Sequence, residues 1–270
     1  MSGPSTSALV VTYRTGPRLR DCLYALNGDP EIGELVIVDN GNLPAETAWL
    51  DTAVADWPKT AQLIRPGNIG FGRACNLAAK AARGAMLVFV NPDAMIRRGS
   101  VAAFRAALTD APSPCLVGGK IFGLDGKEQR GARRKALTWA TATGLRRWTE
   151  EGAPPPQGPV PVDAVSGAFF AMSKVDFLAV GGFDPSYFLH VEDLDLCRTV
   201  WDQGGRVLYQ PRAGALHFGA TSDAPPRTVA RLKAESLRYY FKKWARSPVD
   251  RALNALLLPL LTRYVRSKAR

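Results

Sequence analysis

Three carboxylates that could supply a general base lie close together in the sequence. Glu192, Asp193 and Asp195 fall within four positions, directly after an aromatic run. The chain has a net charge of +11, so it does not need an acidic cluster there for solubility. A carboxylate beside a cleft can remove a proton from a substrate hydroxyl, with a neighbouring acid tuning or anchoring it. The alternative is that these acids complement the dipole at the start of a helix.

Polar residues that could bind a ligand follow three predicted strands. Continuous apolar runs at residues 8–13, 34–40 and 85–90 predict strands that are buried on both faces. The polar residues at their ends are Thr12, Tyr13, Asp39, Asn40, Asn91 and Asp93. Ligands of open α/β sheets bind beyond the carboxyl ends of the strands, where these side chains would gather. The carboxylates favour a metal-bridged diphosphate, and a turn-forming role is the alternative.

A glycine-rich loop follows a short strand predicted at residues 62–65. Residues 66–76 contain three glycines and lead into a helix predicted from Arg73 to Gly84. The N–H groups of such a loop can cradle a phosphate. Glycine by itself is weak evidence, because turns use it for many reasons, and the spacing differs from the dinucleotide-binding fingerprint.

The order of the predicted elements indicates an α/β fold. A strand, a helix over residues 17–26 and a second strand form a βαβ unit. The remaining predicted elements are helices at 99–108, at 174–180 and after the acidic cluster, and strands at 116–122, 162–173 and 206–211. The last strand is expected at a sheet edge, because it ends at Pro211. We expect a mostly parallel central sheet flanked by helices.

The segment 128–161 breaks this pattern. It begins with a basic run at 129–135 and ends with a proline-rich stretch at 154–159. A long loop in a compact domain is usually functional or disordered. We interpret the segment as a flexible basic flap over the acceptor side, with a solvated insertion as an equal alternative.

Several isolated residues are candidates for the site. Ser166 and Gly167 are small residues where a ligand or the backbone comes close. A lone histidine is more often packed than ligating, but the position of His217 just past a strand makes a metal or phosphate contact equally expected. His190, the second histidine, is interpreted as an acceptor-side residue together with Asp195.

Two prolines, Pro225 and Pro226, mark a predicted boundary between a domain at 1–225 and a helical extension at 226–270. The extension combines leucines and aromatic residues with many lysines and arginines. A basic amphipathic helix of this kind can lie on an anionic membrane surface. The alternative is that it packs on the domain or on a second copy in a homodimer.

The composition describes an ordinary folded protein with anionic partners. Of the 270 residues, 46% are hydrophobic and 22% charged, and the pI is about 9.8. Four widely spaced cysteines predict buried thiols, not a disulfide framework or a zinc site. The polar start of the chain predicts no signal peptide, and no run reaches the ~18 apolar residues of a membrane span. We expect a cytoplasmic protein, either free or on the inner face of the cytoplasmic membrane.

Taken together and in order, several motifs resemble family 2 of the inverting, GT-A-fold glycosyltransferases. The nearest subgroup is the rhamnosyltransferase-like enzymes of bacterial polysaccharide assembly, and the match runs over about residues 8–220. The motifs are Val11-Thr-Tyr, Val38-Asp-Asn, the run from Gly67 to Asn76, Asn91-Pro-Asp-Ala, Ser166-Gly-Ala, Gly182-Phe-Asp and the run from Glu192 to Arg198. Arg14 departs from the family pattern, which commonly has asparagine there.

The resemblance implies a nucleotide-sugar donor, linked to dTDP or UDP, at the sheet edge. It assigns the base and ribose to Thr12, Tyr13 and Asp39. The loop that would close over the nucleotide contributes Asn68, Gly70, Arg73 and Asn76.

The resemblance also implies a metal site and a base. Asp93 matches the last acid of the family's metal-binding Asp-x-Asp, with Asn91 in place of the first acid. Mg²⁺ or Mn²⁺ would be the ion, with His217 as a second contact. Asp193 matches the catalytic base and Glu192 its acidic neighbour.

The implied activity is transfer of a sugar, with rhamnose as the subgroup's sugar, to a lipid-linked or polysaccharide acceptor in cell-envelope glycan synthesis. The chemistry agrees, since inverting transfer needs one carboxylate base and positive charge on the departing diphosphate. A nucleotidyltransferase on a similar fold is one alternative, and a catalytically inactive scaffold, suggested by Asn91, is another. A nucleic-acid-binding protein fits the charge, but carboxylates at strand ends would repel phosphate without a metal, so no nucleic-acid partner is expected.

Overall fold

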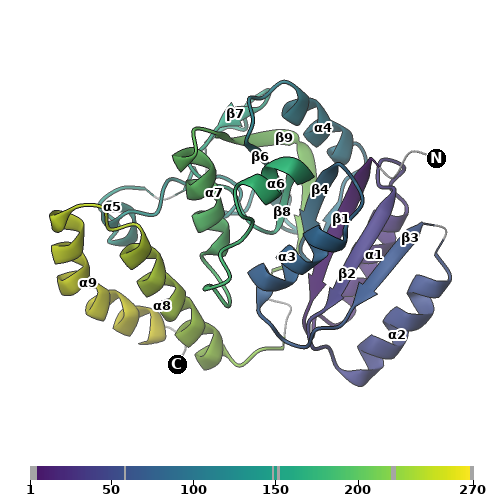
Figure 1. Ribbon diagram of the computed structural model, residues 1–270, viewed down its shortest axis with the longest axis horizontal. Helices are drawn as coiled ribbons and strands as arrows, with labels where there is room; N and C mark the ends of the chain where they lie inside the picture. Colours follow the sequence, from purple (N-terminus) through teal and green to yellow (C-terminus); the bar gives the residue numbers. More distant parts are fainter. Residues whose placement is uncertain (1–4, 58, 148, 151–152, 220–222, 268–270) are drawn as a thin grey trace.

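A nine-stranded sheet runs through the computed structural model, which describes residues 5–57, 59–147, 149–150, 153–219 and 223–267 (Figure 1). The strand order is β3-β2-β1-β4-β8-β6-β9-β5, and β7 pairs with β9. The strands are β1 (Thr6–Thr12), β2 (Glu34–Asp39), β3 (Thr60–Ile64), β4 (Met86–Val90), β5 (Ala94–Ile96), β6 (Cys115–Phe122), β7 (Val160–Pro161), β8 (Phe169–Ser173) and β9 (Arg206–His217).

The first half of the sheet is parallel, as the sequence predicts. Strands β3, β2, β1 and β4 run in the same direction, and every residue of β1, β2 and β4 is buried. This explains their continuous apolar sequences. Beyond β4 the sheet becomes mixed, because β8 lies antiparallel between β4 and β6, and β6 then pairs in parallel with β9. The carboxyl ends of β1, β2 and β4 therefore meet at one edge.

Helices cover both faces of the sheet (Figure 1). They are α1 (Arg18–Asn27), α2 (Pro44–Ala55), α3 (Phe71–Ala81), α4 (Ser100–Thr109), α5 (Trp139–Ala142), α6 (Lys174–Ala179), α7 (Glu192–Asp202), α8 (Pro226–Lys243) and α9 (Pro248–Ser267). Alternate strand residues face opposite cores. Val10 belongs to the core that also contains residues of α1, α2 and α4, whereas Val11 belongs to the core that contains residues of α3, α6 and α7. The α/β architecture is confirmed.

The prediction that the strand beginning at Arg206 is an edge strand ending at Pro211 is wrong. β9 continues to His217 and lies between β6 and β5. Its register against β6 shifts between Gly119, which pairs with Gln210, and Lys120, which pairs with Gly214. Pro211 lies in this irregularity, where the sheet does not require its missing N–H. The extra strand length carries His217 to the edge where the site lies.

Three other element boundaries differ from prediction. The strand expected over 162–173 begins only at Phe169, which leaves residues 162–168 as a connection beside the site. Helix α3 begins at Phe71, not at Arg73, and ends before Gly84. Helix α2 and the short strand β5 were not predicted.

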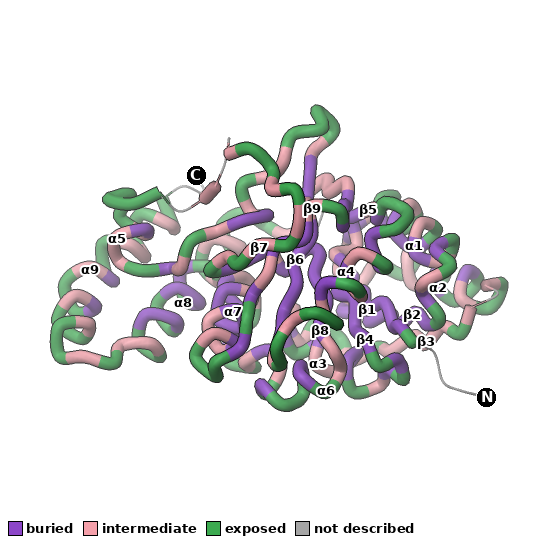
Figure 2. Tube along the Cα trace, turned by 90° about the horizontal axis from the view of Figure 1, so that it is seen from above, coloured by how far each residue is buried: buried purple, intermediate pink, exposed green. Residues whose placement is uncertain are grey.

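The helices α8 and α9 form a hairpin at the end of the molecule opposite α1 and α2 (Figure 1). They join the main core through Leu237, Tyr240, Phe241 and Leu258. Trp139, in the 128–161 segment, stacks on Phe241 at 4.0 Å between ring centroids. Figure 2 shows burial on only part of α9, whose buried residues are Asn254 and Leu258. Within the described residues, the helices are too short or too polar to cross a membrane.

Candidate active site

The acidic cluster begins α7 at an unusual backbone bend. His190 and Val191 both adopt left-handed conformations, with φ of 66° and 72°. Such values are costly for a β-branched residue such as Val191 and concentrate at functional sites. The bend turns the chain directly into α7, whose first residues are Glu192 and Asp193.

Asp193 is held by donors from three different segments. Its Oδ2 accepts hydrogen bonds from Arg134 Nη2 at 2.5 Å and from the Gly167 N–H at 2.9 Å. Its Oδ1 accepts from the Leu194 N–H at 2.8 Å. Burial raises the pKa of Asp193, but the Arg134 guanidinium and the Gly167 N–H outweigh it and hold the pKa below its usual range. Asp193 is therefore an ionised, oriented carboxylate with 18% of its side chain exposed.

Glu192 is in a different environment although it is the next residue. It is 6% exposed, and its Oε2 has no hydrogen-bond partner among the described residues. Burial, together with the charge of Asp193, raises the pKa of Glu192 to about 8. Glu192 is therefore mostly protonated at neutral pH and lies beneath the site. Two neighbouring acids with pKa values driven apart are typical of catalytic sites.

A carboxylate and an imidazole face each other at the ends of β4 and β9. Asp93 Oδ1 lies 3.3 Å from His217 Nε2. Gln129 fixes the ring, because its Nε2 donates to the His217 carbonyl and its Oε1 lies 2.8 Å from Nδ1. The Gln129 oxygen therefore accepts from Nδ1–H, and the other ring nitrogen, Nε2, faces Asp93.

This arrangement fits a divalent cation. Two electron-pair donors 3.3 Å apart repel each other unless a proton or a cation lies between them. Oxygen ligands suit Mg²⁺ and Mn²⁺, and the imidazole nitrogen favours a transition ion such as Mn²⁺. The described residues contain no group of three or more His, Cys, Asp or Glu suited to a metal. Ligand oxygens would therefore complete the coordination.

The Asp93–His217 pair and Asp193 belong to one continuous site. The Asn91 N–H, two residues before Asp93, donates to the Ala168 carbonyl at 2.8 Å. The adjacent Gly167 N–H donates to Asp193. The segment 128–134 also touches both ends, through Gln129 at His217 and Arg134 at Asp193. The Asp93–His217 pair thus lies beside an ionised carboxylate at the carboxyl edge of the sheet, an arrangement suited to a diphosphate leaving group and a hydroxyl nucleophile.

The comparison with protein families agrees with this chemistry. The model of glycosyl transferase family 2 matches residues 7–177, more than half of the chain. The chain belongs to this family. It is therefore a glycosyltransferase.

Relatives of the glycosyltransferase support the assignment. The N-acetylglucosaminyl-diphospho-decaprenol L-rhamnosyltransferase of Mycobacterium tuberculosis is 27% identical over 239 residues, which covers 79% of this chain and 76% of the relative. The solved structure of a Pyrobaculum calidifontis mannosyltransferase with GDP-Man and Mn²⁺ superposes with a TM-score of 0.64 at 17% identity, covering 99% of this chain and 73% of that one. GalNAc-T7 with UDP, GalNAc and Mn²⁺ gives 0.64 at 17% identity over 98% of this chain, which spans only 54% of that structure. These structures confirm the GT-A fold.

The residues expected to bind the nucleotide lie at the ends of β1 and β2. Asp39 already accepts from the N–H groups of Gly41 and Asn42 and from Thr47 Oγ1. Asn42 also accepts from Thr12 Oγ1 and from the Arg14 N–H. Asp39 and Thr12 therefore shape the turn, and Tyr13, which is half-buried, follows directly after β1. Their contact with a nucleotide stays a prediction.

The glycine loop of the transferase is fixed to the strand ends and to the approach to α7. Asn68 Oδ1 accepts from Asn40 Nδ2 and from the Gly70 N–H, each at 3.3 Å. Gly70 has φ of 88°, and an added Cβ would lie 2.7 Å from the Phe188 carbonyl oxygen. A side chain at this position would be both strained and blocked.

Two predicted nucleotide contacts of this loop region have structural partners. Asn76 pairs its side-chain amide with both backbone groups of Phe183, at 2.7 and 2.9 Å. Both ends of the amide are thus engaged with Phe183, and contact of Asn76 with a nucleotide stays a prediction. Arg73 Nε donates to the Pro185 carbonyl at 2.7 Å, and the residue is otherwise exposed. α3 thereby anchors the segment that enters α7.

Asp195, which is expected on the acceptor side, is engaged with other residues, so this role stays a prediction. Asp195 is 2% exposed and accepts from Tyr187 Oη, Lys243 Nζ and Trp244 Nε1. Helical geometry turns it away from Asp193 and toward α8. It therefore anchors α8 to α7.

The other acceptor-side residues lie near Asp193 in the sequence or in space. Ser166 Oγ accepts from the Ala168 N–H, and Gly167 approaches Asp193 so closely that an added Cβ would lie 3.1 Å from the Asp193 Cβ. The absence of a side chain at Gly167 therefore leaves room for the Asp193 carboxylate. Burial, together with the charge of Lys233, lowers the pKa of His190 to about 4, so its ring is neutral at physiological pH.

Sequence reasoning missed Gln129, Arg134 and Asn42 as site residues. The basic run at 129–135 is expected to belong to a flexible basic flap, but two of its members form ion pairs within the structure. Arg133 is buried against Glu128 at 2.6 Å, and Arg134 has 13% of its side chain exposed in its pair with Asp193. An irregular loop has no helical or strand periodicity from which burial could be predicted. The sequence alone therefore does not distinguish its buried cations from its exposed ones.

Proposed function

We propose that this glycosyltransferase moves a sugar from a nucleoside-diphosphate donor to an acceptor hydroxyl, with inversion, and that Asp193 is the base. The observation that carries the proposal is the Asp193 carboxylate, ionised and held by three donors beside the Asp93–His217 pair. A base must be correctly ionised and fixed in direction, and Asp193 meets both conditions.

The reaction follows from these positions. Asp193 accepts the proton of the acceptor hydroxyl as its oxygen forms a bond to the anomeric carbon. The bond from that carbon to the donor phosphate breaks, and the nucleoside diphosphate leaves with the electron pair. One displacement inverts the anomeric centre, so no covalent nucleophile of the enzyme is needed.

The departing diphosphate requires compensation of its charge. Asp93 and His217 are the residues that would hold a divalent ion, and Asn91 Nδ2 lies 3.3 Å from His217 Nε2. When bound, Mn²⁺ or Mg²⁺ would neutralise the negative charge that develops on the leaving group. Asn91 supplies a neutral amide where the family often has an acid, so the ion would rely more on donor oxygens.

The substrates are proposed from the relatives. The mycobacterial relative is named for transfer of L-rhamnose to an N-acetylglucosaminyl-diphospho-decaprenol. We therefore propose a dTDP- or UDP-linked donor, with rhamnose as the first sugar to test, and a lipid-linked or polysaccharide acceptor in cell-envelope glycan synthesis. Thr12, Tyr13, Asp39 and the loop from Asn68 to Arg73 would bind the nucleotide. A cytoplasmic enzyme at the inner membrane surface fits such an acceptor, and a homodimer stays a prediction.

The test is a thermal-shift panel of nucleoside diphosphates and nucleotide sugars with and without Mn²⁺, followed by product detection. A ligand of the native state raises the melting temperature by mass action. We expect stabilisation of the wild type by a dTDP or UDP compound with metal, and its loss in Asp93→Asn. Asp110→Asn, an exposed residue at the C-terminal end of α4, is the matched control.

The outcomes separate the alternatives. Release of nucleoside diphosphate with a glycosylated product supports the proposal. Consumption of a nucleoside triphosphate with release of pyrophosphate would instead establish a nucleotidyltransferase. Absence of both stabilisation and turnover with every donor would overturn the donor site.

A further inference from the structure

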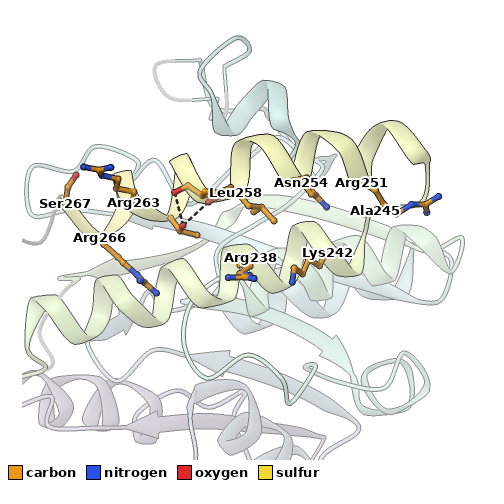
Figure 3. Close-up of a pocket in the computed structure, with 12 residues that line it drawn as sticks. Arg238, Lys242, Ala245, Arg251, Asn254, Leu258, Arg263, Arg266 and Ser267 are labelled. Atoms are coloured by element: carbon orange, nitrogen blue, oxygen red, sulfur yellow. Dashed lines mark hydrogen bonds between the residues drawn. The ribbon is translucent and has the colours of Figure 1, made fainter.

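A groove lies between α8 and α9, outside the candidate active site. It has a volume of about 880 Å³. Figure 3 shows Arg238 and Lys242 on the α8 side of the groove, and Arg266 reaching from α9 toward α8. Arg251 and Arg263, from α9, complete a basic lining. Five of the twelve residues that line the groove are therefore long cations, and they come from two facing helices.

These five cations are uncompensated. Arg238, Lys242, Arg251, Arg263 and Arg266 are exposed, and none forms an ion pair with a carboxylate of the described residues. The acids of the two helices are engaged elsewhere, since Glu235 pairs with Arg231 and Asp250 accepts from Ser247. Like charges concentrated on one groove repel one another, so an anion bound there would relieve that repulsion.

An apolar stripe lies on the outer side of α9. Leu256, Leu260 and Tyr264 follow one another at four-residue spacing and are 68%, 63% and 59% exposed. Val249, near the start of the helix, is 66% exposed. Asn254 and Leu258 instead face the protein. α9 thus presents leucines outward with arginines at their flank, which is the pattern of a helix lying in a membrane interface.

The side of α8 that faces away from the groove is hydrogen-bonded to the residues around the start of α7. Ser236 Oγ donates to the Leu189 carbonyl at 2.8 Å, and Lys243 Nζ donates to Asp195 at 2.7 Å. Side chains two positions apart on a helix point in nearly opposite directions, so Arg238 points away from Ser236. α8 therefore separates the groove from the segment that carries the proposed base, by about one helix diameter, ~10 Å.

We propose that the groove between α8 and α9 binds the phosphate groups of anionic phospholipids, with Leu256, Leu260 and Tyr264 inserted among the upper acyl carbons. The charge of the lining and the exposed apolar stripe select this occupant together, because a phospholipid surface offers both anions and hydrocarbon. This docking would hold the base near the bilayer surface. The functional value of holding the base there rests on the proposed transfer to a lipid-linked acceptor. The binding of lipid to the groove does not depend on that proposal.

The experiment is flotation of the full chain with vesicles of phosphatidylcholine alone or with about one third phosphatidylglycerol. The test variant combines Arg238→Gln, Lys242→Gln and Arg266→Gln. The matched control combines Lys80→Gln, Arg98→Gln and Arg212→Gln, three exposed cations outside the groove, so that both variants lose equal charge. We expect wild type and control to bind the anionic vesicles. The partition coefficient of the groove variant onto anionic vesicles should be about 100-fold lower than that of the wild type. Each cation removed should lower it by roughly tenfold or less. Melting curves check that each variant is folded.

Several outcomes would overturn the proposal. One is that the wild-type protein does not bind anionic vesicles. Another is that the two triple variants lose vesicle binding equally, which would indicate that binding depends only on net charge. A stable dimer that the groove variant dissociates would assign this face to a second copy, and groove-dependent binding to DNA with none to vesicles would assign it to nucleic acid. In support, Leu256→Gln with Leu260→Gln should also weaken flotation.

Activity on a water-soluble acceptor separates this proposal from the proposed function. The groove variant should transfer sugar to a soluble acceptor as fast as the wild type. If the wild type transfers no sugar but floats with anionic vesicles in a groove-dependent manner, the proposed function fails and the lipid site stands.

Discussion

Arg134 Nη2 lies 2.5 Å from Asp193 Oδ2, and this ion pair joins the irregular 128–161 segment to the first turn of α7. Arg134 Nη2 also donates to the Val165 carbonyl, so its guanidinium bridges the loop, the 162–168 connection and the proposed base. The pair holds Asp193 ionised and sets its direction. Arg134 is therefore a positioning residue for the base.

Replacement of Arg134 by Gln should raise the pKa of Asp193, because the guanidinium that favours the charged carboxylate is lost. The acidic limb of the pH profile of kcat/KM should move to higher pH, and kcat should fall by roughly 10- to 100-fold through misplacement of the base. Arg134→Lys keeps the charge and should restore most of the pH profile. An unchanged acidic limb in Arg134→Gln would show that Asp193 is not the titrating base.

Replacement of Asp193 and of Glu192 by their amides should have very different effects on kcat. Asp193→Asn removes the base and should lower kcat by roughly 10²- to 10⁴-fold. Glu192→Gln should change kcat only a few-fold, since Glu192 is mostly protonated at neutral pH and Gln has the same shape. Comparison of the two rates at pH 7 checks this, and equal losses would contradict the separation of roles.

Glu192 should also make stability depend on pH. Its pKa rises from 4.5 to about 8 on folding, so between these values the native state binds more protons than the unfolded state. Stability from this group therefore decreases as pH rises through that window. The melting temperature of Glu192→Gln relative to wild type should increase from pH 5 to pH 9. A constant difference would indicate that Glu192 is ionised in the native protein.

The metal pair can be tested without turnover. Asp93→Asn and His217→Gln should each abolish the Mn²⁺-dependent part of the thermal shift produced by a nucleoside diphosphate. Gln129→Leu removes the partner of His217 Nδ1 and should weaken Mn²⁺ binding by about 10- to 100-fold. His190→Asn is the control, because asparagine tolerates the left-handed backbone at that position. If His217→Gln keeps the full Mn²⁺-dependent thermal shift, His217 is not a metal ligand.

Gly167 provides a steric test of the base position. In Gly167→Ala the added Cβ would lie 3.1 Å from the Asp193 Cβ, which displaces the carboxylate by a few tenths of an ångström. We expect roughly a 10-fold or greater loss of kcat with little loss of stability. In Gly131→Ala, a neighbouring control, the nearest atoms lie at 3.6 Å, an ordinary contact. Equal activity of the two variants would contradict the close packing at Gly167.

The sequence by itself determined the parallel half of the sheet and its polar edge. Continuous apolar runs require burial on both faces, and parallel strands place their carboxyl ends together, so the sequence alone places Asp39 and Asp93 at one edge. The acidic cluster at 192–195 was also recognised. The division of the chain at residue 225 stays a prediction.

The tertiary structure decided which polar side chains are available for chemistry. Asn76 and Asp195 share residue types with the site but are used by Phe183 and by α8, whereas Gln129 and Arg134, from an irregular loop, reach His217 and Asp193. It also separated Glu192 from Asp193, because burial and a guanidinium act in opposite directions on adjacent carboxyls. Sequence periodicity reports local burial, whereas hydrogen bonding and desolvation depend on partners distant along the chain, so only the folded structure fixes them.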